Sequence, residues 1–161
     1  MNPIREYLYK MVAVQSDTGT AMERDMAKVI YDMIKSDPYF KAHPDYCGTF
    51  LQKDILDRPV VWALKKGTRD KTIILMGHYD AVEIESYGIY KPYALKPDLL
   101  REKFKEGNFG DEVLRADLED EKWLFGRGAA DMKAGLAINM HILFTNDVED
   151  ENILFEALPD E

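Results

Sequence analysis

Apolar residues recur every three or four positions through the first 34 residues, a spacing typical of helices with one buried face. Asn2 and Pro3 suit the start of the first helix, because Asn can cap a first turn and Pro lacks an N–H that this turn leaves unbonded. Thr20, with Glu23 three residues later, has the pattern of a capping box. We therefore expect two amphipathic helices before the stretch KSDPYF at 35–40.

After residue 58 the pattern changes to short apolar runs rich in β-branched residues, which is typical of strands. Residues 59–66 and 71–80 are two such runs, and the turn-like sequence KGTRD between them predicts that they pair with each other. The run TIILM has apolar residues on both faces, as in a central strand covered by helices. Two further strands are predicted at 123–126 and 152–158, with a helix at 131–144 between them.

This alternation of strands and helices predicts an α/β fold, with a mostly parallel twisted sheet flanked by helices. Residues 83–122 interrupt the alternation with a polar stretch, in which one helix is expected at 96–105. A connection of this length is unusual inside a compact domain, so we expect 83–122 to be an insertion.

The composition excludes several classes of partner. The 161 residues fit one domain, and 46% apolar with 32% charged residues is typical of soluble globular proteins. Lys and Arg number 21 against 30 Asp and Glu, and the resulting net charge of −9 repels phosphate backbones and anionic lipids. We therefore expect neither a nucleic-acid nor a membrane partner. The N-terminus lacks the apolar core of a signal peptide, which favours a cytoplasmic location.

Candidate functional residues follow the expected strands, at the end where open α/β sheets bind ligands. His78 and Asp80 follow TIILM, and residues two apart in an extended segment face the same side. His78 could ligate a divalent metal while Asp80 binds its other ring nitrogen and fixes its orientation. The alternative is a core histidine satisfied by a nearby acid, and on this short motif alone that explanation is favoured.

Two further groups of acids occupy equivalent places. Asp131 ends the glycine-containing loop GRGAAD, where it could cap the following helix, ligate a cation, or do both. Asp160 and Glu161 follow the last expected strand, as a general base or as a solvated chain end. Histidine, Asp and Glu side chains at three strand ends together fit a Zn²⁺ or Mn²⁺ hydrolase site.

The segments ILMGHYDAV, FGRGAADMKAG and PDE resemble, in order and approximate spacing, those of the zinc-dependent amidohydrolase and peptidase family M20. The resemblance runs from the first helix to the last residue, and HYDAVEIESYG is most similar to the arginine-utilisation branch. It implies a zinc-peptidase-like catalytic domain that cleaves an amide or peptide bond of an amino-acid derivative or small peptide. It also implies two zinc ions per full-length site, with manganese or cobalt as alternatives.

The resemblance assigns roles to four residues. His78 is similar to a ligand of one metal, Asp80 to its orienting partner, and Asp131 to the carboxylate that bridges two metals. Glu161 is similar to the first residue of a Glu–Glu pair, which is the general base in this family. Glu83 and Ala134 stand where relatives commonly have proline and glycine, which indicates a divergent branch.

The resemblance further implies that residues 1–161 are the N-terminal part of a catalytic domain, without the later metal ligands and the lid or dimerisation domain. We therefore expect the isolated chain to be inactive, and the full-length form could be a homodimer. We also expect 152–158 to be an exposed sheet edge that promotes association. Two alternatives stay open: a non-catalytic remnant or interaction module with the same fold, and, less favoured, a phosphate-binding domain that uses GRGAAD.

Overall fold

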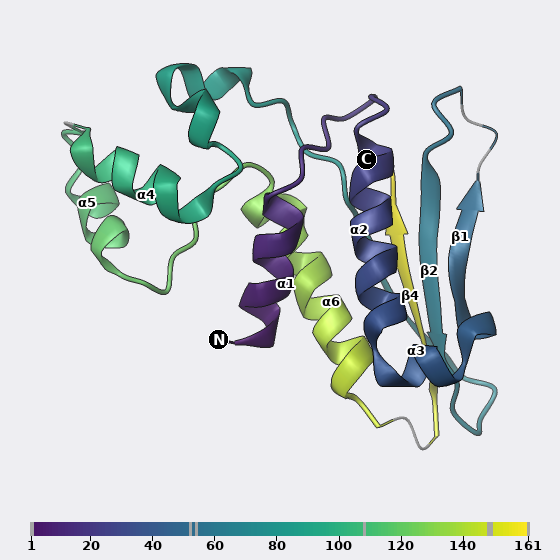
Figure 1. Cartoon of the computed structure of the whole chain (residues 1–161). Helices are drawn as coiled ribbons and strands as arrows, with labels where there is room; N and C mark the ends of the chain where they lie inside the picture. The colour runs from purple at the N-terminus through teal and green to yellow at the C-terminus, as the bar shows by residue number, and fades with distance from the viewer. Residues whose placement is uncertain (1, 52, 54, 108, 148–149, 161) are drawn as a thin grey trace.

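A mixed four-stranded sheet lies at the centre of the fold, with helices packed against it (Figure 1). The computed structural model describes residues 2–51, 53, 55–107, 109–147 and 150–160. The strands are β1 (Cys47–Leu51), β2 (Pro59–Lys65), β3 (Thr72–His78) and β4 (Asn152–Leu158), in the spatial order β1-β2-β4-β3. Strand β2 is antiparallel to both β1 and β4, and β3 is parallel to β4. The α/β class is confirmed, but the expected mostly parallel sheet was wrong.

Strands β2 and β3 do not pair with each other, because β4 lies between them. Asn152, the first residue of β4, binds the connection between β2 and β3. Its backbone N–H donates to the Lys71 carbonyl at 2.8 Å, and its side-chain amide donates to the carbonyls of Arg69 and Lys71 at 3.1 Å. Its side-chain oxygen accepts from the Gly67 N–H at 3.0 Å. One residue of β4 thus binds the β2–β3 connection, and the hairpin expected from KGTRD does not form.

The core lies between the sheet and three helices, α1 (Pro3–Val12), α2 (Glu23–Ser36) and α6 (Ala134–Thr145). The first two confirm the amphipathic helices expected from the periodicity, and Asn2 caps α1 by accepting from the Ile4 N–H at 3.0 Å. The short helices α3 (Pro38–Ala42) and η1 (Pro44–Tyr46), which lead into β1, were not expected. Within the described part of the chain, no helix combines the length and apolar character needed to cross a membrane.

Residues 83–122 form a helical lobe that lies beyond α1 as seen from the sheet (Figure 1). The lobe contains η2 (Glu85–Tyr93), α4 (Pro97–Glu106) and α5 (Glu112–Glu119), of which only α4 was expected. The Tyr9 hydroxyl of α1 donates to the Asp98 carboxylate of α4 at 2.6 Å. This contact joins the lobe to the helix that packs on the core.

Residues 123–126 are irregular, so the strand expected there was wrong. Arginine side chains bind backbone carbonyls at the start of this stretch: Arg5 donates to the carbonyl of Lys122, which precedes the stretch, at 3.2 Å and to that of Trp123 at 3.4 Å. Arg101 also donates to the Trp123 carbonyl. Trp123 itself is half exposed, and the stretch therefore offers no buried face to a sheet.

Strand β3 is an edge strand with exposed apolar side chains. Ile73, Ile74 and Met76 are 51%, 56% and 57% exposed. Because β4 is paired on both sides, the expectations of a central TIILM strand and of an edge at 152–158 were both wrong. An apolar strand edge favours pairing with another sheet edge. We therefore expect association at the edge of β3 and not at β4.

We expect the isolated chain to self-associate through the outer edge of β3, and the substitution Ile74→Lys to weaken this association. Lysine places a charge on the edge and removes apolar surface. We expect a dissociation constant about tenfold higher, which corresponds to about 1.4 kcal/mol. Sedimentation velocity over a range of concentrations measures it.

Ile55→Lys is the matched control, because Ile55 is 97% exposed and lies outside the strands. Equal weakening by the two variants would show that the β3 edge is not the contact.

Candidate metal centre

The carboxyl ends of β3 and β4 lie side by side, and two groups of candidate residues follow them. The parallel register pairs His78 with Leu158, and the Tyr79 N–H donates to the Leu158 carbonyl at 2.9 Å. Asp80 and Asp160 each lie two residues beyond the last residue of their strand. Glu161 lies outside the described residues. Two of the three expected strand ends therefore exist, and Asp131 follows no strand.

His78 lies between two carboxylates. Its Nδ1 is 3.0 Å from Asp80 Oδ1, and its Nε2 is 3.1 Å from Asp131 Oδ1. The Asp80 side chain is 4% exposed and that of Asp131 is 80% exposed, so the Nε2 pairing lies at the solvent side. A carboxylate that holds one ring nitrogen fixes the ring orientation and directs the other nitrogen toward a ligand. The structure thus brings together three of the four candidate residues.

Protonation of His78 is coupled to these two acids. Burial lowers the pKa of His78, but the hydrogen bonds with Asp131 and Asp80 raise it by more, so the net pKa lies above its ordinary 6.5. A metal ion on Nε2 has to replace the proton there. Metal binding by His78 should therefore weaken as the pH falls.

Asp131 lies in the irregular segment η3 (Ala129–Lys133), not at the start of a helix. Helix α6 begins only at Ala134 without a side-chain cap, and Asp131 itself is extended, with φ −124° and ψ 106°. Gly128 makes the turn before it with a φ of +70°, and a Cβ there would lie 2.9 Å from that of Ala81. The expected N-cap role was therefore wrong, and the carboxylate lies beside His78 instead.

The loop after α1 binds the second oxygen of Asp80. The Thr18 hydroxyl donates to Asp80 Oδ2 at 2.7 Å. This loop runs along 79–81: the Ala81 N–H donates to the Ser16 carbonyl at 2.8 Å, and the Thr18 N–H donates to the Ala81 carbonyl at 3.0 Å. Asp80 is therefore held through both oxygens. No local pattern around Thr18 signals this contact, and sequence reasoning missed it.

Lys133 connects the Asp131 segment to the same loop. It is fully buried, and its Nζ donates to the Val14 carbonyl at 3.0 Å. Burial lowers the pKa of Lys133 from 10.5 to about 8, and the carboxylates of Asp17 and Asp80 offset part of this shift. A lysine at the start of an apolar helix carries no sequence signal of burial, so this contact was also missed.

The donor atoms fit a zinc ion in part. In a tetrahedral zinc site with bonds of about 2.0–2.1 Å, two ligand atoms lie about 3.3 Å apart. His78 Nε2 and Asp131 Oδ1, at 3.1 Å, are close to this separation. Among the residues that the structure describes, no group of three or more His, Cys, Asp or Glu side chains is arranged to hold a metal. A complete site therefore needs ligands in addition to these two.

Two proteins of Bacillus subtilis (strain 168) are similar to this chain in sequence. Uncharacterized protein YqjN is 39% identical over 158 residues, which are 96% of this chain and 28% of that protein. Protein RocB is 33% identical over 171 residues, covering 100% of this chain and 30% of that protein. The chain thus spans less than a third of the length of either relative. No family model matches the chain.

Among solved structures, the fold is similar to that of an M20 family metallo-carboxypeptidase, Sso-CP2 from Sulfolobus solfataricus. The TM-score is 0.59 at 16% sequence identity, over 99% of this chain and 31% of the other. At this identity the likeness establishes the fold alone. The fold expected from the sequence resemblance is therefore confirmed as an α/β arrangement similar to that of an M20 peptidase, with a mixed sheet.

We expect Lys133 to make stability depend on pH between about 8 and 10.5. In this range the unfolded chain binds the proton and the folded chain does not, so the free energy of unfolding rises with pH. The contribution is about 3 kcal/mol, since each pKa unit corresponds to about 1.4 kcal/mol. Urea unfolding at several pH values measures it in the wild type and in Lys133→Met.

Because tyrosines and other lysines titrate in the same range, the difference between the two proteins is the relevant quantity. Lys41→Met, which removes an exposed lysine, should behave as the wild type. An unchanged pH dependence in Lys133→Met would contradict the account of this contact.

Proposed function

We propose that this chain supplies part of the active site of a metal-dependent hydrolase that cleaves an amide or peptide bond of an amino-acid derivative or small peptide. The observation that carries the proposal is the position of His78 at the carboxyl end of β3, with Asp80 on one ring nitrogen and the exposed Asp131 on the other. The fold likeness to a metallo-carboxypeptidase supports it. Because two ligands do not complete a catalytic zinc site, we assign the activity to a longer protein that contains this chain.

Each residue has a role in this proposal. His78 Nε2 and an oxygen of Asp131 would hold zinc, with manganese or cobalt as alternatives, and Asp131 would bridge to a second ion. Asp80 orients the imidazole through Nδ1. A bound zinc would polarise the substrate carbonyl and make the attacking water more acidic. Glu161 would take the proton from that water and pass it to the leaving amine.

Two further parts of the chain enter the proposal. We propose that the lobe at 83–122 is an insertion into the catalytic fold. The exposed apolar edge of β3 is the observation that favours the alternative function, an interaction module without catalysis. The two functions differ in their response to metal, because only the hydrolase requires it.

The test measures hydrolysis of N-acylated amino acids and dipeptides by the longer protein. We expect a chelator to abolish activity and zinc to restore it, and His78→Ala or Asp131→Ala to reduce kcat/KM to background. Asp80→Asn should cost about tenfold to a hundredfold, the usual effect of losing a residue that orients a metal ligand. The isolated chain should be inactive.

His43→Ala is the matched control, since His43 is exposed and lies on another part of the fold. Hydrolysis that survives both the chelator and His78→Ala would contradict the proposal. Stable binding partners and no metal dependence would support the interaction module.

A further inference from the structure

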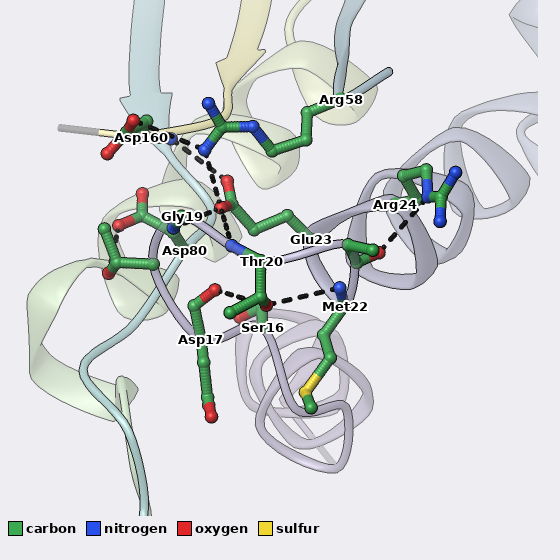
Figure 2. Close-up of polar contacts among 12 residues, drawn as sticks. Ser16, Asp17, Gly19, Thr20, Met22, Glu23, Arg24, Arg58, Asp80 and Asp160 are labelled. Carbon is green, nitrogen blue, oxygen red and sulfur yellow. Dashed lines mark hydrogen bonds and ion pairs between the residues drawn. The ribbon is translucent and has the colours of Figure 1, made fainter. Parts of the chain in front are cut away.

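A buried carboxylate at the start of α2 joins three segments near the candidate centre (Figure 2). Glu23 is fully buried, and its Oε1 accepts from the N–H groups of Gly19 and Thr20 at 2.8 and 3.3 Å. The same oxygen accepts from Arg58 Nη1 at 2.9 Å. Its Oε2 accepts from the backbone N–H of Asp160 at 3.1 Å. The capping box expected with Thr20 as the N-cap was wrong in part: α2 begins only at Glu23, Glu23 accepts from the Thr20 N–H, but the Thr20 hydroxyl accepts from the Met22 N–H at 3.3 Å and not from that of Glu23.

The sheet topology explains why these segments meet. Arg58 directly precedes β2, and β2 runs antiparallel to β4, with Val61 paired to Ala157. The start of β2 and the end of β4 therefore lie at the same end of the sheet. Asp160 follows β4 at that end, where Glu23 also begins α2.

The backbone at Asp160 needs support from its surroundings. Its φ of +56° lies in the left-handed region, which residues other than glycine seldom adopt. Such a conformation persists where neighbouring groups determine it. Here the N–H of Asp160 is bound by Glu23, and its carboxylate lies 3.3 Å from Arg58 Nη1. Two side chains, Glu23 and Arg58, therefore hold Asp160, which directly precedes Glu161 in the sequence.

The Glu23 carboxylate also binds the loop that holds Asp80. The loop whose N–H groups it binds, at Gly19 and Thr20, carries Thr18, and the Thr18 hydroxyl donates to Asp80. Figure 2 shows Asp80 and Asp160 on the same side of Glu23. Removing one partner of a buried ion pair leaves the other charge buried and uncompensated, so the contact between Glu23 and Arg58 is costly to break.

We propose that Glu23 and Arg58 are positioning residues that hold the turn at Asp160, which directly precedes in sequence the residue given the role of general base in the proposed function, Glu161. The effect on catalysis rests on the proposed function. The contacts that hold the turn at Asp160 do not depend on it. It predicts that removing either residue loosens the Asp160 turn before it affects the rest of β4.

The structural part is tested in this chain by amide hydrogen exchange. In Glu23→Ala, the Asp160 amide should exchange about tenfold faster or more, because a bond to a charged acceptor is lost. The amide of the buried Phe155 in β4 should keep its rate. Asp25→Ala is the matched control, an exposed acid in the same helical turn, and should change neither amide.

If the Phe155 amide also exchanges faster in Glu23→Ala, the substitution has destabilised β4 as a whole. The comparison is then made in Glu23→Gln, which keeps the side-chain volume and an acceptor oxygen. There the Asp160 amide alone should exchange faster. An Asp160 amide at the wild-type rate in a folded Glu23 variant would overturn the inference.

The catalytic part is tested in the longer protein. Glu23→Gln and Arg58→Ala should lower kcat about tenfold to a hundredfold, the effect of a displaced catalytic group, with KM unchanged and the pH profile of kcat shifted. Arg58→Lys should restore part of the loss, and Asp25→Asn should have no effect. Zinc affinity should be retained in the two Arg58 variants and in Asp25→Asn.

The two hypotheses fail in different ways. A wild-type protein without zinc binding or hydrolysis contradicts the proposed function, and the hydrogen-exchange rates then decide whether Glu23 holds the turn. A hydrolase whose kcat and pH profile are unchanged in Glu23→Gln contradicts the inference alone.

Discussion

The parallel pairing of β3 with β4 is the interaction on which the arrangement of the centre depends. Because parallel neighbours need a crossover, the chain must return from the end of β3 to the start of β4, and α6 makes that return. The segment that precedes α6 therefore lies beside the end of β3, which places Asp131 next to His78. The same pairing places Asp160, which follows β4, at the same end of the sheet as His78. Residues far apart in sequence thus meet through one strand pairing.

The local patterns predicted most of the elements and part of the site. Helical periodicity predicted α1 and α2, and apolar β-branched runs predicted β2, β3 and β4. The two-residue spacing of His78 and Asp80 predicted their common side. Strand order could not be predicted, because β4 pairs with two strands far away in sequence and the contacts that accompany this pairing, such as those of Asn152, join segments about 80 positions apart. In the stretch 123–126, where a strand was expected, Arg5 and Arg101 from two other segments both donate to the Trp123 carbonyl.

The residues that sequence reasoning missed are mainly buried charges. Lys133 and Glu23 occupy positions where a local pattern suggests an exposed helix start, yet both are fully buried. Their partners are backbone groups and side chains from other segments, such as the Val14 carbonyl for Lys133 and Arg58 for Glu23. Buried charges need such partners, and only the folded chain shows where the partners lie. Lys133 ties the Asp131 segment to the loop after α1, and Glu23 binds that loop next to Thr18.

The central claim is that His78 presents Nε2 as a metal ligand while Asp80 holds its other nitrogen. The most direct measurement is a zinc titration of the chain followed by nitrogen-15 NMR of the imidazole rings. The account predicts that zinc shifts the Nε2 resonance of His78, that His43 and His141 stay unchanged, and that Asp131→Ala weakens the response. A His78 ring that does not respond to zinc, or three histidines that respond alike, would contradict it.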